Sequence, residues 1–498
     1  MSRQIALLVD RQGKASLVLV GDTGSIYIPE LPRARSGAGR LRGLRLLHTH
    51  LTDALLSQED LMDMLFLRLD SVGVLTVDEF GGPDTFQHAH LLPGGGDEPY
   101  RVHPPTRWDK VETNFNDQAQ ALEDELTRIT ADARETDSKS GRAILVSVSQ
   151  APKSIQESSL NELAELADTA GLTVAGTMIQ RVRQTNYKFI LGKGKLAELE
   201  VLALTGNASV ILFDGELSPA QLHNLADVTE RKVIDRTQLI LDIFAQRAST
   251  RAGKLQVELA QLQYTQPRLT GKNRAMDRLA GGIGGRGPGE TKLETDRRKV
   301  RERIARIKKD IEALRTQRGY TRGRRAKARV PVASLVGYTN AGKSTLLNTL
   351  TNAEVLAEDK LFATLDTTTR RLRFPEEREL ILTDTVGFIR SLPKELKEAF
   401  RATLEELEAA DLLLHVADAG HPELEMQLTA VEGILEELEL NEIPKVLVLN
   451  KWETLDEEAA QALSHLYPQA IKVSAVTRFG LDDLTAEIIR RIDWERDL

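Results

Sequence analysis

The sequence contains no cysteine, and this absence excludes several kinds of site at once. Without thiols the chain can form no disulfide, hold no iron–sulfur cluster and bind no zinc through thiolates. It also has no apolar run long enough to cross a membrane, and its first residues lack the charged segment and long apolar segment of a secretory signal. We therefore expect a cytoplasmic protein with no membrane span.

One segment of the chain has the pattern of a phosphate-binding loop. It reads Gly337-Tyr338-Thr339-Asn340-Ala341-Gly342-Lys343-Ser344-Thr345. An apolar run over residues 330–336 precedes it and a helical pattern begins near Lys343, so main-chain N–H groups and a helix N-terminus are expected to meet at one anion site. In such a loop Lys343 reaches the β- and γ-phosphates, and the Ser344 hydroxyl ligates Mg²⁺.

Four further motifs follow in an order and spacing that indicate a nucleotide-binding domain. Asp384 ends an apolar run, which is expected to place it near Mg²⁺ and the Gly387 N–H near a γ-phosphate. Thr364 lies in the preceding loop, which can fold onto Mg²⁺ and release after hydrolysis. The last two motifs are expected to enclose a purine base. In chain order the four read Phe362-Ala363-Thr364-Leu365-Asp366, Asp384-Thr385-Val386-Gly387, Asn450-Lys451-Trp452-Glu453 and Ser474-Ala475-Val476.

Together these motifs resemble the translation-factor branch of P-loop GTPases, and residues outside them narrow the resemblance to the HflX family of ribosome-associated GTPases. The further residues lie in five blocks, in family order: Gly192-Lys193-Gly194-Lys195, residues 213–219, Asp235-Arg236-Thr237, residues 253–262 and residues 281–290. The resemblance covers residues 142–498 and leaves the N-terminal part of the chain outside it.

The resemblance implies a Mg²⁺-dependent enzyme that hydrolyses GTP to GDP and phosphate, with Lys343, Thr364 and Gly387 as its catalytic residues. It also implies that the GTP form binds the large (50S) ribosomal subunit and its RNA, and that hydrolysis releases the protein. Ribosome splitting or rescue is the expected role. We expect the protein to act as a monomer.

The length and composition agree with a multidomain α/β protein. The 498 residues, 41% of them hydrophobic and 28% charged, leave room for about three or four domains that each bury a core. We expect an N-terminal extension that is a small α/β unit (residues 1–140), an HflX-like α/β domain (141–235), an antiparallel helical hairpin with a Gly-rich tip and a basic linker (236–329), and a P-loop GTPase domain with a mostly parallel sheet (330–498).

Two residues depart from the usual GTPase pattern. Glu453 stands where an Asp normally accepts two hydrogen bonds from guanine, and its carboxylate sits one methylene farther out, which weakens the expected preference for guanine over adenine. Phe388 follows Gly387, where Ras-like enzymes place the Gln that orients the attacking water. Phenylalanine cannot hold a water, so the intrinsic rate of hydrolysis is expected to be low.

Asn340 offers one way to replace that missing group. In some GTPases with a hydrophobic residue after the Gly of this motif, an Asn at this loop position helps to hold K⁺ beside the phosphates. The alternative is that Asn340 only stabilises the loop through side-chain hydrogen bonds to the backbone. The sequence leaves both open.

The net charge of −8 conceals a basic block, since residues 318–329 hold six Arg and Lys residues and no acidic one. Such a block indicates a polyanion site or a solvated linker. Before it, apolar residues recur at helical spacing from Leu293 to Leu314 and a shorter stripe runs over residues 255–262, so we expect a hairpin with residues 281–290 near its tip. The candidate RNA contacts are Arg286, Arg322, Arg324, Arg325 and Lys327.

Residues 143–234 alternate apolar runs with helical patterns, which predicts a small, mostly parallel sheet. Gly192-Lys193-Gly194-Lys195 opens one of its helices. This segment is a candidate second site for ATP or for RNA phosphate, with an ordinary helix start as the alternative.

The N-terminal part holds five of the nine histidines, in His48-x-His50, His88-x-His90 and His103. On a strand each pair would point to one face, as a metal site could require. No carboxylate completes an obvious ligand set in the sequence, so we interpret them as ordinary polar histidines.

Two further hypotheses remain at this point. An enzyme that hydrolyses both ATP and GTP to remodel RNA is favoured by Glu453 and the segment from Gly192 to Lys195. A non-hydrolysing RNA-binding switch is favoured by Phe388. Nucleotide selectivity and turnover on ribosomes would separate the three.

Overall fold

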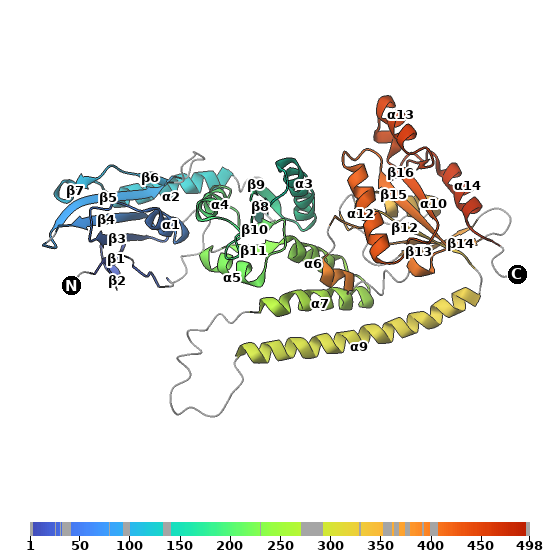
Figure 1. Ribbon diagram of the computed structural model, residues 1–498, viewed down its shortest axis with the longest axis horizontal. Coiled ribbons are helices and arrows are strands. Elements are labelled where there is room, and N and C mark those ends of the chain that lie inside the picture. The colour runs from blue at the N-terminus through green and yellow to red at the C-terminus, as the bar shows by residue number, and fades with distance from the viewer. Residues whose placement is uncertain are drawn as a thin grey trace. The chain divides into compact units, whose positions relative to one another are not determined.

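The computed structural model describes most of the chain, which is coloured from end to end in Figure 1. The described residues are 3–24, 26–29, 31, 41–78, 80–92, 100–132, 141–229, 231–269, 292–327, 330–351, 361–362, 368–373, 379–390, 393–398 and 407–494. They form two compact units, Met1–Arg236 and Thr237–Leu498. Across these ranges, no helix has the length and apolarity that crossing a membrane demands.

The first unit begins with a seven-stranded sheet in the order β2-β1-β3-β4-β5-β6, with β7 paired to β5. Only β3 and β4 run parallel; the other pairs are antiparallel. The helices α1 (Gln58–Phe66) and α2 (Phe115–Asp132) bury Met64 and Leu126 in its core. The strands are β1 (Ile5–Asp10), β2 (Ala15–Val20), β3 (Leu44–His50), β4 (Ser71–Val77), β5 (Pro83–Leu91), β6 (Tyr100–Val102) and β7 (Thr106–Arg107).

A second sheet in the same unit is parallel throughout, in the order β11-β10-β8-β9, as the apolar runs predict. Its elements are β8 (Arg142–Ser149), α3 (Lys153–Thr169), β9 (Thr173–Arg181), α4 (Lys193–Thr205), β10 (Val210–Phe213), α5 (Pro219–Val228) and β11 (Lys232–Asp235). Ala197 and Leu204 of α4 pack in the core of the N-terminal sheet. Each sheet has its own buried core, and α4 contributes residues to both.

The second unit starts with helices. They are α6 (Arg236–Arg247), α7 (Arg251–Thr265) and α9 (Lys292–Lys327). α7 and α9 lie side by side (Figure 1), and they run antiparallel because Arg303 pairs with Glu258 while Arg297 bonds the Leu269 carbonyl. Ile307, in the predicted apolar seam, is fully buried. α9 is longer than the apolar pattern suggests, since its backbone stays helical past Gly319 and Gly323 to Lys327.

The rest of the second unit is a six-stranded sheet in the order β13-β14-β12-β15-β16-β17, parallel except for β13. Successive strand residues face opposite sides, so Leu335 packs under α10 and α14 while Val336 packs under α12. The elements are β12 (Val332–Val336), α10 (Lys343–Thr351), β13 (Thr368–Arg373), β14 (Glu379–Asp384), β15 (Leu412–Asp418), α12 (Leu424–Glu437), β16 (Lys445–Asn450), α13 (Glu457–Leu466), β17 (Ile471–Lys472) and α14 (Leu481–Arg491).

Candidate nucleotide-binding site

The loop from Gly337 to Gly342 joins the central strand β12 to helix α10, and its glycines are sterically required. Gly337 has φ 153°, and a Cβ there would lie 2.1 Å from the Val416 carbonyl oxygen. Gly342 has φ 84°, and a Cβ there would lie 2.3 Å from Asn450 Nδ2. Asn340 also has positive φ, at 60°, a conformation that Asn tolerates better than most residues. The loop is thus shaped to turn its N–H groups toward an anion.

Lys343 is the first residue of α10, and its side chain is buried. Its ammonium donates to the carbonyls of Gly337 at 3.0 Å and Tyr338 at 2.8 Å, so it lies back across the loop. Burial lowers the pKa of Lys343 to about 8, with the nearby Asp384 carboxylate opposing that shift. A phosphate group would compensate the buried charge far better than two carbonyls do.

Ser344 and Asp384 meet at the end of the sheet. The Ser344 hydroxyl donates to Asp384 Oδ2 at 2.6 Å, and Asp384 is the last residue of β14, paired with Leu335 of the neighbouring strand. Thr385 is held in place by its hydroxyl, which donates to the Leu335 carbonyl at 2.7 Å. A hydroxyl and a carboxylate side by side are the hard oxygen ligands that suit Mg²⁺.

Gly387 and Phe388 tie the second motif to the phosphate loop. The Phe388 N–H donates to the Gly337 carbonyl at 3.0 Å, and the Thr339 N–H donates to the Phe388 carbonyl at 2.8 Å. A Cβ on Gly387 would lie 3.1 Å from Lys343 Nζ, so its backbone is beside the lysine that is expected to reach the phosphates. The Phe388 ring is 1% exposed and packs in the core with α12, which removes it from any catalytic role. Val386 is buried beside them.

The end of the site that is expected to bind the base is organised by Asn450 at the end of β16. Its Nδ2 donates to the Ala341 carbonyl at 2.9 Å, and its Oδ1 accepts from the Ala475 N–H at 3.0 Å. Lys451 takes the left-handed conformation at φ 60° and pairs with Asp418 at 2.8 Å. Glu453 is exposed on a short turn, free to meet a ligand from solvent.

The remaining residues of this end differ in exposure. Ser474 is fully buried and accepts a hydrogen bond from the Thr477 N–H, whereas Val476 is 74% exposed. Trp452 packs partly buried in the adjacent core and donates its main-chain N–H to Val473. Thr345 is half-buried on α10. The structure thus brings the Asn450 and Ser474 motifs to the same edge as the phosphate loop.

The remaining candidate residues are either not among the described ones or lie on other elements. Ala363, Thr364, Leu365 and Asp366 lie outside the described residues, as does Arg286 with the segment 281–290. Phe362 is described, and its ring is buried edge-on against Phe244 of α6, with centroids 4.6 Å apart. Arg322, Arg324, Arg325 and Lys327 lie on the last turns of α9. Gly192 is the N-cap residue of α4 and supplies no side-chain cap.

Sequence reasoning missed two residues that shape the site. Asp418 ends β15 and pairs with Lys451, and Thr349 of α10 donates to the Ala475 carbonyl at 2.9 Å. The sequence could have indicated Asp418 as a site residue, because it ends an apolar run as Asp384 and Asn450 do. Nothing in the sequence indicates Thr349, since a Thr inside a helix is common.

The sheet order, the phosphate loop and the loops gathered at one edge define a P-loop GTPase. Three family profiles match the chain in succession: "GTP-binding GTPase N-terminal" over residues 157–245, "GTP-binding GTPase Middle Region" over 247–325 and "50S ribosome-binding GTPase" over 332–451. The chain belongs to the HflX family, and it is an enzyme that hydrolyses GTP.

Two HflX relatives bear this out over most of their length. GTPase HflX of Caldanaerobacter subterraneus subsp. tengcongensis is 48% identical over 357 residues, which cover 72% of this chain and 82% of that protein. GTPase HflX of Escherichia coli K12 is 47% identical over 338 residues, covering 68% and 79%. A solved GTP-binding protein from Sulfolobus solfataricus, in complex with GDP, aligns with 71% of this chain and 98% of that one at 25% identity and a TM-score of 0.37.

Proposed function

We propose that this GTPase binds the large (50S) ribosomal subunit in its GTP form, hydrolyses GTP there and then releases, as a monomer in the cytoplasm. Ribosome splitting or rescue is the proposed role. The observation that carries the proposal is the single edge of the sheet where Lys343, Asp384 and Asn450 meet, in a family whose G-domain profile is that of a 50S ribosome-binding GTPase.

The chemistry is transfer of the γ-phosphoryl group to water, and the chain's part is mostly positioning and charge. Ser344 and Thr364 would hold Mg²⁺, which neutralises charge developing on the phosphate oxygens. Lys343 and the N–H groups of the phosphate loop bind the β- and γ-phosphates. The Gly387 N–H, beside Lys343, binds the γ-phosphate and orients the loop that follows it.

The buried Phe388 requires that something else orient the attacking water. Because its ring is packed in the core, hydrolysis by the protein alone is slow, and the ribosome or an ion supplies the missing group. K⁺ bound near Asn340 is our candidate ion. Replacing K⁺ by Na⁺ while hydrolysis is measured tests this role. An unchanged rate would mean that Asn340 binds no K⁺ and serves only to adopt the positive φ of the loop.

The central experiment is GTP hydrolysis measured with and without 50S subunits. We expect turnover to rise by at least about tenfold with subunits, by analogy with the gain that a partner-supplied group gives other GTPases. Omitting Mg²⁺ should abolish both rates. Equal turnover with and without subunits would refute the ribosome-dependent part of the proposal.

Basic residues near the end of α9 are the proposed RNA contacts. Replacing Arg322, Arg324, Arg325 and Lys327 by Gln should weaken 50S binding and lower the slope of log affinity against log salt by up to about 0.7–0.9 for each lost phosphate contact. GTP affinity should be unchanged, which serves as the control. An unaltered salt slope would mean that these residues form a solvated linker.

Hydrolysis of both ATP and GTP is the second candidate. It is favoured by the exposed Glu453 and by α4, whose first N–H groups receive no side-chain cap from Gly192. Glu453 bears on ATP binding in the GTPase domain, whereas α4 offers a separate site for ATP at Lys193–Lys195 in the small α/β domain. If ATP is hydrolysed at that separate site, replacing Lys195 by Ala should lower ATP turnover and spare GTP turnover; unchanged ATP turnover would exclude the site.

A further inference from the structure

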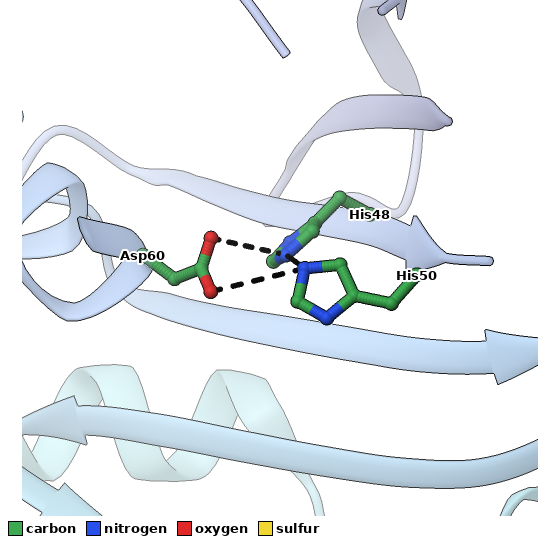
Figure 2. Close-up of side chains that lie close together, drawn as sticks. All are labelled: His48, His50 and Asp60. Carbon is green, nitrogen blue, oxygen red and sulfur yellow. Dashed lines mark hydrogen bonds and ion pairs between the residues drawn. The ribbon is translucent and has the colours of Figure 1, made fainter. Parts of the chain in front are cut away.

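Two histidines and one aspartate from the N-terminal sheet converge at a point remote in sequence from the nucleotide site. His48 and His50 are two residues apart on β3, so their side chains face the same side of the sheet. Asp60 lies in the first turn of α1 (Figure 2). His48 Nε2 is 3.2 Å from Asp60 Oδ1 and 3.2 Å from His50 Nε2, and His50 Nε2 is 3.9 Å from Asp60 Oδ2. One ligand atom of each residue lies within 4.8 Å of the others.

The hydrogen bonds of His50 present a lone pair to the shared point. Its Nδ1 is 2.7 Å from the Ala54 carbonyl oxygen. A carbonyl can only accept, so Nδ1 carries the proton and Nε2 of the neutral ring is left as a donor of electrons. Metal-binding histidines commonly anchor their second nitrogen on a backbone carbonyl in this way.

The aspartate is oriented by its own partner. Asp60 Oδ2 accepts hydrogen bonds from both the main-chain N–H and the hydroxyl of Ser57, each at 2.7 Å, while Oδ1 faces His48. Ser57 and Asp60 form the capping box of α1, so the start of the helix fixes the carboxylate. Hydrogen-bonded carboxylates of this kind are typical ligands with outer-shell support.

The separations suit a single small ion. Ligand atoms about 2.0–2.2 Å from Zn²⁺ in tetrahedral geometry lie about 3.3–3.6 Å apart. The two distances of 3.2 Å are close to this range, and the His50–Asp60 distance of 3.9 Å is slightly longer. The His48 side chain is 3% exposed, and those of His50 and Asp60 are 13% and 17% exposed. The cluster is therefore mostly buried but open on the side of His50 and Asp60, which gives an ion a way in.

We propose that His48, His50 and Asp60 bind one divalent transition-metal ion of the Zn²⁺ class. Two imidazoles and a carboxylate, in a chain without thiols, select such an ion rather than Ca²⁺ or a thiophilic metal. Three protein ligands leave a coordination position for water, the arrangement of catalytic rather than structural zinc sites. The site lies in the part of the chain that precedes the segments matched to family profiles.

The test is Zn²⁺ binding to the full-length chain, stripped of metal and kept with Mg²⁺ and GDP. Metal analysis and competition with a chromogenic chelator should give one tightly bound Zn²⁺ per chain. His50→Ala and Asp60→Asn should each weaken this binding by more than about 100-fold, because loss of an outer-shell partner alone costs about 10- to 100-fold. Ser57→Ala should fall in that smaller range.

The control is His103→Ala, which alters the separate histidine group formed by His88, His90 and His103. It should keep one Zn²⁺ per chain with wild-type affinity. GTP hydrolysis by His50→Ala should equal that of the wild type. Co²⁺ added to the wild type should give a visible absorption band that His50→Ala lacks.

The proposal is wrong if wild type binds no Zn²⁺ tightly, or if His50→Ala and Asp60→Asn bind it as wild type does. The three residues would then form a hydrogen-bonded network only. Circular dichroism and thermal melting verify that the variants are folded. If His50→Ala is unfolded, Asp60→Asn decides the question, since an Asn oxygen can still accept from Ser57 and preserve the helix start.

Discussion

The phosphate end of the nucleotide site is built from main chain, whereas the histidine groups of the N-terminal sheet are built from side chains. At Gly337 and Gly342 there is no space for an extra carbon, because a carbonyl and an amide already occupy it. At His88 and His90 the side chains are buried or half-buried, and this burial lowers the pKa of each ring. The first kind of site is disrupted by adding atoms, and the second is weakened by removing atoms or adding protons.

Lys343 is the side chain on which the main-chain site most depends, and its loss should have the largest effect. Lys343→Ala removes a buried positive charge and its hydrogen bonds to phosphate, so we expect GTP affinity to fall by about 100-fold or more. Fluorescent GTP titration measures it. Lys153→Ala, at an exposed lysine of the other unit, is the control and should bind normally. Undiminished affinity in Lys343→Ala would remove the phosphate-loop assignment.

Adding one methyl group to the loop should come next in size. In Gly337→Ala the new Cβ would meet the Val416 oxygen at 2.1 Å, and we expect a loss of about 2–4 kcal/mol in unfolding free energy together with weaker GTP binding. Gly433→Ala is the matched control, because Gly433 is exposed in α12 with nothing within 4 Å of its added Cβ. That variant should gain up to about 1 kcal/mol. Equal melting temperatures for the two variants would show that the loop shifts to accommodate the added methyl group without loss of stability.

Protonation of His88 and His90 should lower the stability of the N-terminal sheet, and by less than the loop substitution lowers that of the GTPase domain. Burial lowers the pKa of both His88 and His90 to about 4, helped by the charges of His103, His90 and Arg101 around them. The unfolded chain takes up protons near pH 6.5, so the stabilisation is complete above that pH and is lost as pH falls to about 4. We expect a loss of about 1–2 kcal/mol after solvent screening.

Hydrogen exchange of peptides from the first unit, followed from pH 7 to pH 4, measures this loss. His88→Phe keeps a stacked ring beside His103 and removes the titration, so its stability should fall less steeply. A pH profile identical to that of the wild type would show that His88 does not contribute.

The smallest effect is expected at the base-binding end. Glu453→Asp shortens the carboxylate by one methylene, to the length of the usual guanine-reading motif, and Glu453 is exposed and unconstrained by core packing. We expect GTP to be favoured over ATP by up to about tenfold more than in the wild type. Competition of each nucleotide against labelled GDP measures the ratio. Equal competition by ATP and GTP in both forms would exclude base reading by residue 453.

The parts of the fold that follow from local rules could be predicted from the sequence. The phosphate loop needs Gly at fixed positions because the backbone itself binds, and the small parallel sheet needs continuous apolar strands separated by helices. The end of α9 could not be predicted in this way. Residues 318–329 were expected to form a basic linker, yet the helix continues through Gly319 and Gly323 to Lys327, since each glycine costs a helix only about 1 kcal/mol.

Contacts between distant segments were the parts that sequence could not supply. Phe362 was expected to line the nucleotide site, but its ring packs on Phe244, more than a hundred residues away in the chain. Asp60 was overlooked as a partner of His48 and His50, although Ser57 and Asp60 have the spacing of a capping box. That spacing places Asp60 at the start of a helix, and only the fold brings the helix start to the histidines.

The two hydrogen bonds of Asn450 mean that one amide group joins segments at positions 341, 450 and 475. A carboxylate in its place would repel the Ala341 carbonyl. An alkyl side chain would make neither hydrogen bond, so the loops at Ala341 and Ala475 would no longer be joined through this residue. The residue that opens the base-reading motif is therefore also a brace between the two ends of the pocket. Loss of guanine preference in an Asn450 variant would not by itself identify a contact with the base, because the same change alters the shape of the loop that receives the phosphates.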